Sequence, residues 1–187
     1  MMVGTLEGGF VDPPREAAHA FRALMMAIAR PGTIERIVGA KPPAPLSCAA
    51  GTLLLTLTDP DTPVFLAGDM DNPEVRSWVA FHTGAPLTGP SHAMFALGRW
   101  EDLAPLDPYP IGTPEYPDRS TTLIVETDRL EPSGSVLTGP GIRDRAELAL
   151  PDAEAMARNS RLFPLGLDFY LTCGDGVAAL PRSTRIG

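Results

Sequence analysis

The sequence predicts an α/β fold: a three-layer helix-sheet-helix sandwich built around a mixed β-sheet. Segments with helical spacing of apolar residues alternate along the chain with short apolar runs typical of buried strands, which favours this fold over an all-β barrel. The last two apolar runs are joined only by Gly174-Asp175-Gly176, which predicts a hairpin and therefore an antiparallel pairing. Because 187 residues suffice to bury one core, we expect a single domain over residues 1–187.

The clearest helical pattern comes first. Apolar residues recur three and four positions apart over 15–30, and Pro31-Gly32 ends the run. Residues 33–38 alternate weakly between apolar and polar side chains, which predicts a strand, and the proline-rich residues 40–46 predict a loop.

Two more helices are predicted in the first half of the chain. Residues 48–58 are apolar and numerous enough for a buried helix that Ser47 caps, and a short buried strand follows over 64–67. Asn72 is a good capping residue, and the proline and acid that follow it are favoured in the first turn of a helix. Gly84 is expected to end this third helix.

The second half continues the alternation with shorter elements. Residues 93–97 predict a strand, and the proline-rich residues 107–120 predict a loop suited to a functional or interface role. Two strands are predicted at 121–126 and 136–138. Residues 152–161 predict a helix capped by its first residue.

The C-terminal segment predicts a turn, a strand, the glycine-rich turn and a second strand. Pro181 ends the second strand, since proline cannot donate a hydrogen bond to a sheet. Asp168 lies where the first strand of this pair begins. A buried carboxylate without a partner is costly, so Asp168 is expected to meet an arginine, such as Arg182, or backbone N–H groups.

Charge and cysteine usage exclude several classes of partner. The formal net charge is −8 and the sequence pI is about 4.8, so the chain is not expected to bind nucleic acid or anionic membranes. The longest apolar stretch of its first half, 23–29, is too short to cross a bilayer. Cys48 and Cys173 are isolated, and the N-terminus has no signal-peptide pattern, so we expect a protein of the reducing cytoplasm.

No constellation for metal or covalent catalysis stands out. His19, His82 and His92 have none of the close spacings of metal ligands, and the two cysteines lie far apart in the sequence. The Gly-x-Ser-x-Gly elbow of serine hydrolases is also missing from the sequence. We therefore expect no metal ion and assign no catalytic residue.

The best candidates for a ligand site are Arg22, Asp168, Arg182 and Thr184. An arginine fork can hold a carboxylate, a phosphate or a phosphonate through two hydrogen bonds. The alternative is that Asp168 and an arginine form an ion pair that only fixes the hairpin, which the need to pair a buried acid favours.

Two other segments have both a structural and a functional interpretation. His82-Thr83 ends the third helix, where these residues either cap the helix or take part in an interface. Thr138-Gly139-Pro140-Gly141 forms either a nest of backbone N–H groups for phosphate or a plain turn. The plain turn is favoured, because Pro140 lacks an N–H group and the lysine of a P-loop is missing.

Several strings occur in a specific order over most of the chain. They are His19-Ala20-Phe21-Arg22 with Pro31-Gly32, residues 54–59 with 61–64, residues 81–83 with 85–87, residues 137–142, and the C-terminal segment from Phe163 to Thr184. Together they resemble the PhnH family, the H subunit of the bacterial carbon-phosphorus lyase system. The C-terminal segment, with Phe-Pro-Leu-Gly-Leu-Asp and Pro-Arg-Ser-Thr, is the most specific of them.

The resemblance implies a fold similar to the large domain of pyridoxal-phosphate-dependent transferases. Catalysis with that cofactor requires a lysine in a desolvated pocket to form a Schiff base. Lys41 is the only lysine of the chain, and it lies among prolines in a predicted loop. We therefore expect the fold without any cofactor.

The resemblance also implies a non-autonomous subunit. It would be needed with the G, I and ATP-binding-cassette-like L subunits to make α-D-ribose 1-methylphosphonate 5-triphosphate from ATP and methylphosphonate, with a radical subunit, J, acting later. The nucleosidase step is placed on the I subunit, so no activity is expected of this chain alone. The resemblance further implies a homodimer that docks into a larger complex. The alternative is an independent protein that binds or converts a phosphate or phosphonate ester through Asp168 and nearby arginines.

Overall fold

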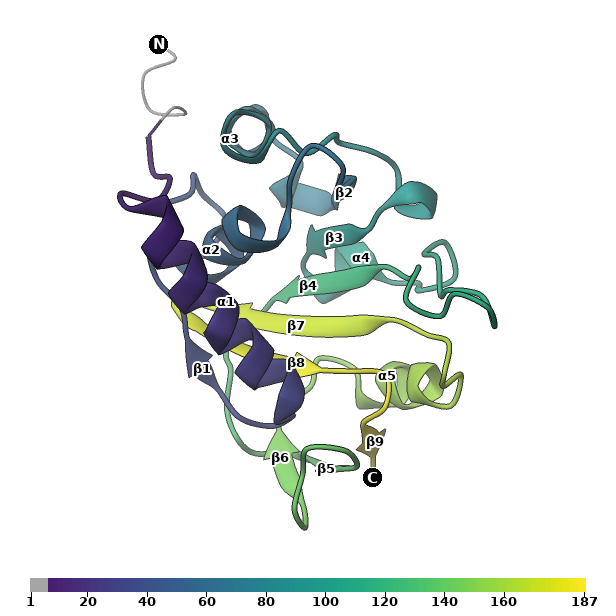
Figure 1. The fold of residues 1–187 in the computed structure, drawn as a ribbon. Helices are drawn as coiled ribbons and strands as arrows, with labels where there is room; N and C mark the ends of the chain where they lie inside the picture. The colour runs from purple at the N-terminus through teal and green to yellow at the C-terminus, as the bar shows by residue number, and fades with distance from the viewer. Residues whose placement is uncertain (1–6) are drawn as a thin grey trace.

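The computed structural model describes residues 7–187, in which a six-stranded sheet forms the central layer (Figure 1). In order across the sheet, the strands are β1 (Glu35–Arg36), β8 (Gly176–Leu180), β7 (Asp168–Cys173), β4 (Thr122–Glu126), β3 (Phe95–Gly98) and β2 (Val64–Leu66). Strands β2, β3, β4 and β7 are parallel, whereas β8 and β1 each join in the antiparallel direction. The sheet is therefore mixed, as the sequence predicts.

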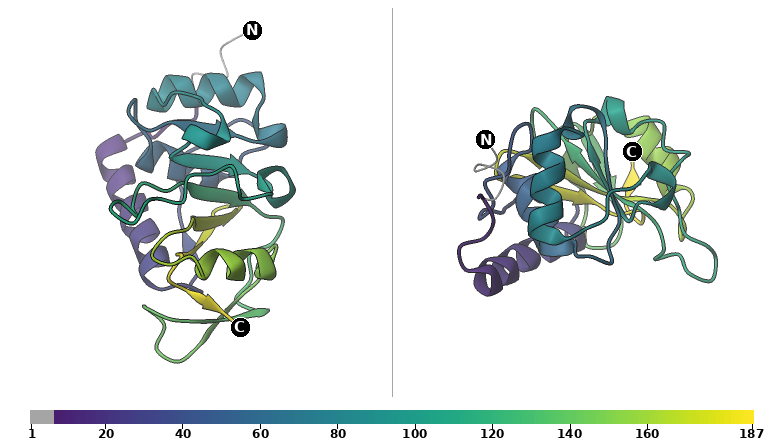
Figure 2. Two further views of the ribbon diagram at one scale, coloured as in Figure 1. Left: turned by 90° about the vertical axis from the view of Figure 1, so that its right-hand side faces the viewer. Right: turned by 90° about the horizontal axis from the view of Figure 1, so that it is seen from above.

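Helices cover both faces of this sheet. They are α1 (Pro13–Ala29), α2 (Cys48–Leu57) and α3 (Pro73–Thr83) on one face, and α4 (Trp100–Leu103) and α5 (Ala153–Ser160) on the other (Figure 2, right). Side chains alternate between the two faces along each strand. In β4, Ile124 packs into the core under α1 to α3, while Leu123 and Val125 pack into the core on the side of α4 and α5. This gives the predicted order of helix layer, sheet and helix layer.

A small antiparallel sheet extends the second layer. Strand β5 (Ser135–Thr138) pairs with β6 (Ala146–Leu148) on one side and with β9 (Arg185–Ile186) on the other. Its Leu137 and Leu148 are fully buried in the core on the side of α4 and α5. Figure 1 shows this sheet below α5, beside the C-terminus. Neither β6 nor β9 is predicted from the sequence, and the short helices α4, η2 (Gly68–Met70) and η3 (Pro90–His92) are likewise unforeseen.

The predicted helix caps are confirmed. Ser47, Asn72 and Asp152 each accept a hydrogen bond from the backbone N–H three residues later, at 3.1, 2.9 and 2.9 Å respectively. Gly84 follows α3 in the left-handed conformation, with φ of 70°, and ends that helix. Polar side chains before apolar runs thus set the starts of α2, α3 and α5.

The predicted strand over residues 33–38 is shorter than expected. Only Glu35–Arg36 pairs with β8. Thr33 is part of a turn, since its N–H donates to the carbonyl of Arg30, and the N–H of Ile37 donates to Asp175 in the hairpin turn. The pairing ends on one side because Arg36 lies opposite Gly176, the first residue of β8 after the hairpin turn, and on the other side near the turn that Thr33 closes after α1.

Candidate functional site

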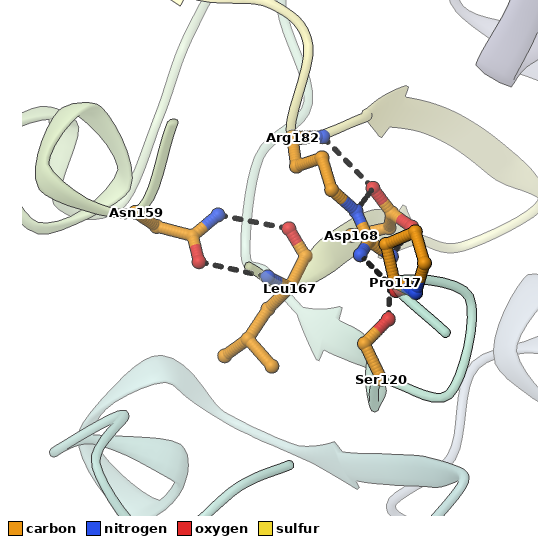
Figure 3. A network of polar contacts seen from close by, with 6 residues as sticks. All are labelled: Pro117, Ser120, Asn159, Leu167, Asp168 and Arg182. Carbon is orange, nitrogen blue, oxygen red and sulfur yellow. Dashed lines mark hydrogen bonds and ion pairs between the residues drawn. The ribbon is translucent and has the colours of Figure 1, made fainter. Parts of the chain in front are cut away.

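The predicted partner of Asp168 is Arg182. Asp168 opens β7, and Arg182 follows the end of β8, so the hairpin brings both residues to the same end of the sheet. Oδ1 of Asp168 accepts from the backbone N of Arg182 at 2.8 Å and from Nε at 3.1 Å, and Oδ2 accepts from Nη2 at 2.5 Å (Figure 3). The side chains are only 12% exposed for Arg182 and 19% exposed for Asp168, so the carboxylate is shielded and fully paired.

The remaining hydrogen bonds of Arg182 reach the loop before β4. Nη1 donates to the carbonyl of Pro117 at 2.7 Å, and Nη2 donates to the hydroxyl of Ser120 (Figure 3). The guanidinium thus makes four hydrogen bonds inside the chain and has few donors left for a ligand. The sequence gives no sign of the bonds to Pro117 and Ser120, because they depend on the path of the 107–120 loop.

The other two members of the predicted cluster lie apart from this network. Arg22 is exposed on α1, whose buried side carries Ala20, Leu24 and Ala27. Thr184 is 1% exposed, and its hydroxyl has no hydrogen-bond partner among the described residues. The four-residue cluster is therefore reduced to the pair of Asp168 and Arg182.

His82 and Thr83 lie in the last turn of α3, as predicted. The Thr83 hydroxyl donates to the carbonyl of Val79 at 2.8 Å and accepts from the N–H of Ala85 at 3.0 Å. The His82 ring packs against Trp78 with a centroid distance of 5.0 Å, and its Nε2 lies 3.3 Å from the carbonyl oxygen of Glu7. Thr83 caps the helix end, and the His82 ring joins α3 to the segment before α1.

A cavity of about 680 Å³ lies between α5 and the segment that follows α4. Its walls are mainly apolar and aromatic, and they include Trp100, Leu106, Tyr109, Ile111, Leu162 and Leu167. Carboxylates are contributed by Asp107 and Asp152, and the arginine of the lining, Arg158, pairs with Glu154 at 2.7 Å. A cavity of this size and composition fits a drug-sized organic molecule better than a bare phosphate.

Two polar contacts hold the walls of this cavity in place. Asn159, on α5, donates from Nδ2 to the carbonyl of Leu167 and accepts at Oδ1 from its N–H, both at 2.8 Å (Figure 3). The N–H of Gly166 donates to the carbonyl of Ile111 at 3.0 Å. These bonds tie α5 and the start of β7 to the 107–120 loop, which Arg182 fixes at its other end. The sequence pattern gives no indication of the role of Asn159.

Tyr109 is the buried titratable group of the cavity wall. Burial raises the pKa of Tyr109 to about 12, so the phenol stays neutral at physiological pH. A neutral phenol can donate and accept hydrogen bonds without adding charge. Together with the two carboxylates, it equips the cavity to orient a bound molecule, and the lining supplies no paired nucleophile and base.

A second buried carboxylate, Glu126, ends β4. It is 8% exposed, and its Oε2 accepts hydrogen bonds from the hydroxyls of Ser47 at 2.9 Å and Thr172 at 3.1 Å. Burial raises the pKa of Glu126, and these hydrogen bonds partly oppose the rise. Glu126 is an acid at the end of an apolar run, the same kind of sequence signal that singles out Asp168 at the start of one, yet it is not among the predicted site residues.

The residues considered for cofactor or metal chemistry are dispersed. Lys41 is exposed in the loop before α2, and Cys48 and Cys173 are free and half-buried. Burial raises the pKa of the Cys173 thiol. Across residues 7–187, no three His, Cys, Asp or Glu side chains are grouped so as to hold a metal ion. None of the described helices has the length and apolar character needed to span a membrane.

Comparison with known proteins gives a consistent result. A family model described as "Bacterial phosphonate metabolism protein (PhnH)" matches residues 8–187. The α-D-ribose 1-methylphosphonate 5-triphosphate synthase subunit PhnH of Rhizobium meliloti (strain 1021) is 43% identical over 190 residues, which cover 96% of this chain and 94% of that protein. The putative C-P lyase subunit protein HtxG of Stutzerimonas stutzeri is 30% identical, covering 96% of this chain and 95% of that protein. The chain therefore belongs to the PhnH family of bacterial phosphonate metabolism proteins.

Proposed function

We propose that this chain is a non-autonomous subunit of the carbon-phosphorus lyase system. It acts with the G, I and L subunits in making α-D-ribose 1-methylphosphonate 5-triphosphate from ATP and methylphosphonate. The observation that carries the proposal is the 43% identity, over nearly the whole length of both chains, to a protein named as the H subunit of that synthase. The internal pairing of Asp168 with Arg182 also supports it, because neither group is free to act as a catalyst.

Several finer features belong to the same proposal. Residues 1–187 act as one domain in the cytoplasm, the chain forms a homodimer, and the dimer docks into a complex that also contains J. The arrangement of sheet and helices is that of the large domain of pyridoxal-phosphate-dependent transferases, used without the cofactor. The exposure of Lys41 supports the last point, because a Schiff-base lysine needs a desolvated pocket.

The proposal is tested by reconstitution. The purified chain, incubated alone with ATP and methylphosphonate, is expected to release no adenine, whereas the mixture with G, I and L is expected to do so. Leaving this chain out of the mixture should abolish or strongly reduce product formation. Measurable turnover by the chain alone, or full activity of the mixture without it, would contradict the proposal.

The alternative is an independent protein that binds a phosphate or phosphonate ester through Asp168 and nearby arginines. The observation in favour of a small-molecule role is the 680 Å³ cavity, whose walls the Asp168–Arg182 pair helps to hold through Pro117 and Ser120. Asp168→Asn separates the two readings. Loss of stability with no effect on ligand binding per folded molecule supports the structural pair, whereas loss of binding in a stable protein supports the alternative.

A further inference from the structure

Two distant segments of the chain meet beside the small antiparallel sheet. Thr138, at the end of β5, pairs in register with Arg185 of β9. A Cβ atom added to Gly139 would lie 3.1 Å from the carbonyl oxygen of Ser183. The turn after β5 and the segment before β9 are therefore packed against each other, at the end of the molecule where Figure 1 shows the C-terminus.

A cavity of about 420 Å³ opens at this junction. It lies between the turn after β5, the C-terminal end of α5 and the segment leading into β9. Its lining consists of Gly139, Pro140, Ser160, Phe163, Ser183 and Arg185. None of these residues lines the 680 Å³ cavity on the other side of α5, so the two cavities are separate sites.

The charge of this lining is opposite to that of the whole chain. The chain has a formal net charge of −8, yet the charged residue of the lining is an arginine, Arg185. Arg185 is exposed, and it forms no ion pair with any described carboxylate, in contrast to Arg182 three residues earlier. An arginine that is not neutralised by the protein, at the wall of a concave site, is available to an anionic ligand.

Two serine residues line the same cavity as Arg185. Ser183 and Ser160 both line the cavity, and the hydroxyl of Ser160 already donates to the carbonyl of Ala157 at 3.0 Å. Thr184, between Ser183 and Arg185 in the chain, is 1% exposed and its hydroxyl has no partner in the described part of the chain. Thr184 does not line the cavity, so the hydroxyl groups that can meet a ligand there are those of Ser183 and Ser160.

We propose that this cavity binds the oxyanion of a phosphate or phosphonate group. Arg185 supplies the counter-charge, and the Ser183 hydroxyl supplies a hydrogen bond. The exposed ring of Phe163 gives an organic substituent on the phosphorus an apolar surface to contact. Gly141, which follows Pro140, packs against the end of α1, because a Cβ there would lie 2.0 Å from the carbonyl oxygen of Ala29. The choice of a phosphorus oxyanion rests on the proposed function, whereas the test below concerns binding by the isolated chain.

The test is calorimetric titration of the full chain with inorganic phosphate, methylphosphonate and phenylphosphonate at fixed, low ionic strength. Arg185→Gln is expected to weaken the binding of all three at least tenfold, and Ser183→Ala to weaken it several-fold. The matched control is Arg15→Gln, which makes the same change of net charge in the first turn of α1, at the opposite end of that helix from Ala29. Its binding should stay within twofold of the unchanged protein.

The outcomes separate the sources of the oxyanion. Tighter binding of phenylphosphonate, lost in Phe163→Ala, identifies an organophosphorus ligand, and equal binding of all three probes identifies the phosphorus oxyanion alone. Failure of the unchanged chain to bind any probe at millimolar concentration overturns the proposal, as does an equal loss in Arg185→Gln and Arg15→Gln. Far-UV circular dichroism of each variant verifies that it is folded. None of these results depends on whether the reconstituted complex is active.

Discussion

The shielded carboxylate of Asp168 holds the two ends of the C-terminal hairpin together, and it orients Arg182, which bonds to the loop before β4. Replacing it with asparagine removes the charge that Arg182 faces while keeping the size of the side chain. Because charged hydrogen bonds in a shielded site contribute more than exposed ones, Asp168→Asn is expected to lower the free energy of unfolding by about 2–3 kcal/mol. Urea denaturation followed by circular dichroism measures the change.

The matched control lies in the same hairpin. Asp175 pairs with Arg36, but the side chains of that pair are 43% and 77% exposed. Exposed ion pairs contribute little, so Asp175→Asn should change the free energy of unfolding by less than about 1 kcal/mol. Equal effects of the two substitutions would show that the shielded pair has no special role in stability.

Glu126 makes the stability of the fold depend on pH. Burial raises its folded-state pKa above the ordinary value of 4.5, so the folded protein holds this proton more tightly than the unfolded chain does. Its contribution to stability is therefore complete below about pH 4.5 and is lost as the pH rises through the folded-state pKa.

Glu126→Gln removes this titration. As the pH rises from 4.5, the free energy of unfolding of the variant is expected to increase relative to that of the unchanged protein, until the difference between the two levels off. Urea midpoints of both proteins between pH 4.5 and 8 measure this difference. Parallel pH profiles would be inconsistent with a raised pKa at this position.

At the scale of single residues, the sequence shows which residue needs a polar partner more readily than it shows every residue that binds to it. That Asp168 needs a partner follows from burial alone, and the hairpin makes Arg182 that partner. Arg22 lies outside this network, because the buried face of α1 runs through Ala20 and Leu24 and leaves Arg22 exposed. Ser120 could not be foreseen, since its position depends on how an irregular loop is folded.

At the scale of the elements, the end of α3 offers a direct test of backbone conformation. Gly84 adopts a φ of 70°, and a Cβ there would lie 3.0 Å from Cγ of Pro60. Gly84→Ala is therefore expected to cost about 1 kcal/mol or more in the free energy of unfolding. The matched control is Gly89→Ala, because Gly89 has a φ of −83° and open space where the Cβ would be.

Thermal denaturation should show a lower midpoint for Gly84→Ala and almost no change for Gly89→Ala. A midpoint for Gly84→Ala equal to that of the unchanged protein would mean that the left-handed conformation at the helix end can be relaxed without cost.

The elements that the sequence predicts correctly are determined by residues close to their own ends. The limits of α2 and α3 follow from Ser47, Asn72 and Gly84, which act within a few residues of the helix ends. The strands β6 and β9 have no such signal, because each has only two or three residues and includes a charged one. They are strands because β5 lies between them, and its pairing with β9 joins residues far apart in the chain.

At the scale of the whole molecule, the two cores lie on opposite faces of one sheet, so they should unfold together. Trp78 is buried in the core under α1 to α3, and Trp100 packs against the core on the side of α4 and α5. Trp100→Phe and Trp78→Phe thus leave one fluorescent reporter on each face.

In each variant, the urea midpoint from tryptophan fluorescence is expected to match that from far-UV circular dichroism, as in a single cooperative transition. Two separate midpoints would contradict the single domain that the sequence predicts.

The overall arrangement of layers follows from the alternation of helices and strands, but the order of strands does not. The order β1-β8-β7-β4-β3-β2 places the last hairpin between β4 and β1, and only long-range pairing decides this position. The cavities are also properties of the whole molecule, since both depend on how α5 lies over the segments on either side of it.

Lys41 gives the molecule a practical property. Reagents that acylate primary amines do not react with arginine, so the lysine in the loop before α2 is their one side-chain target in the whole sequence. The neighbouring Ala40 and Leu46 are buried in the core under α1 to α3, which places the loop beside that layer. A dye attached to Lys41 therefore marks a known position, and energy transfer from it can report which face of the molecule a labelled subunit approaches.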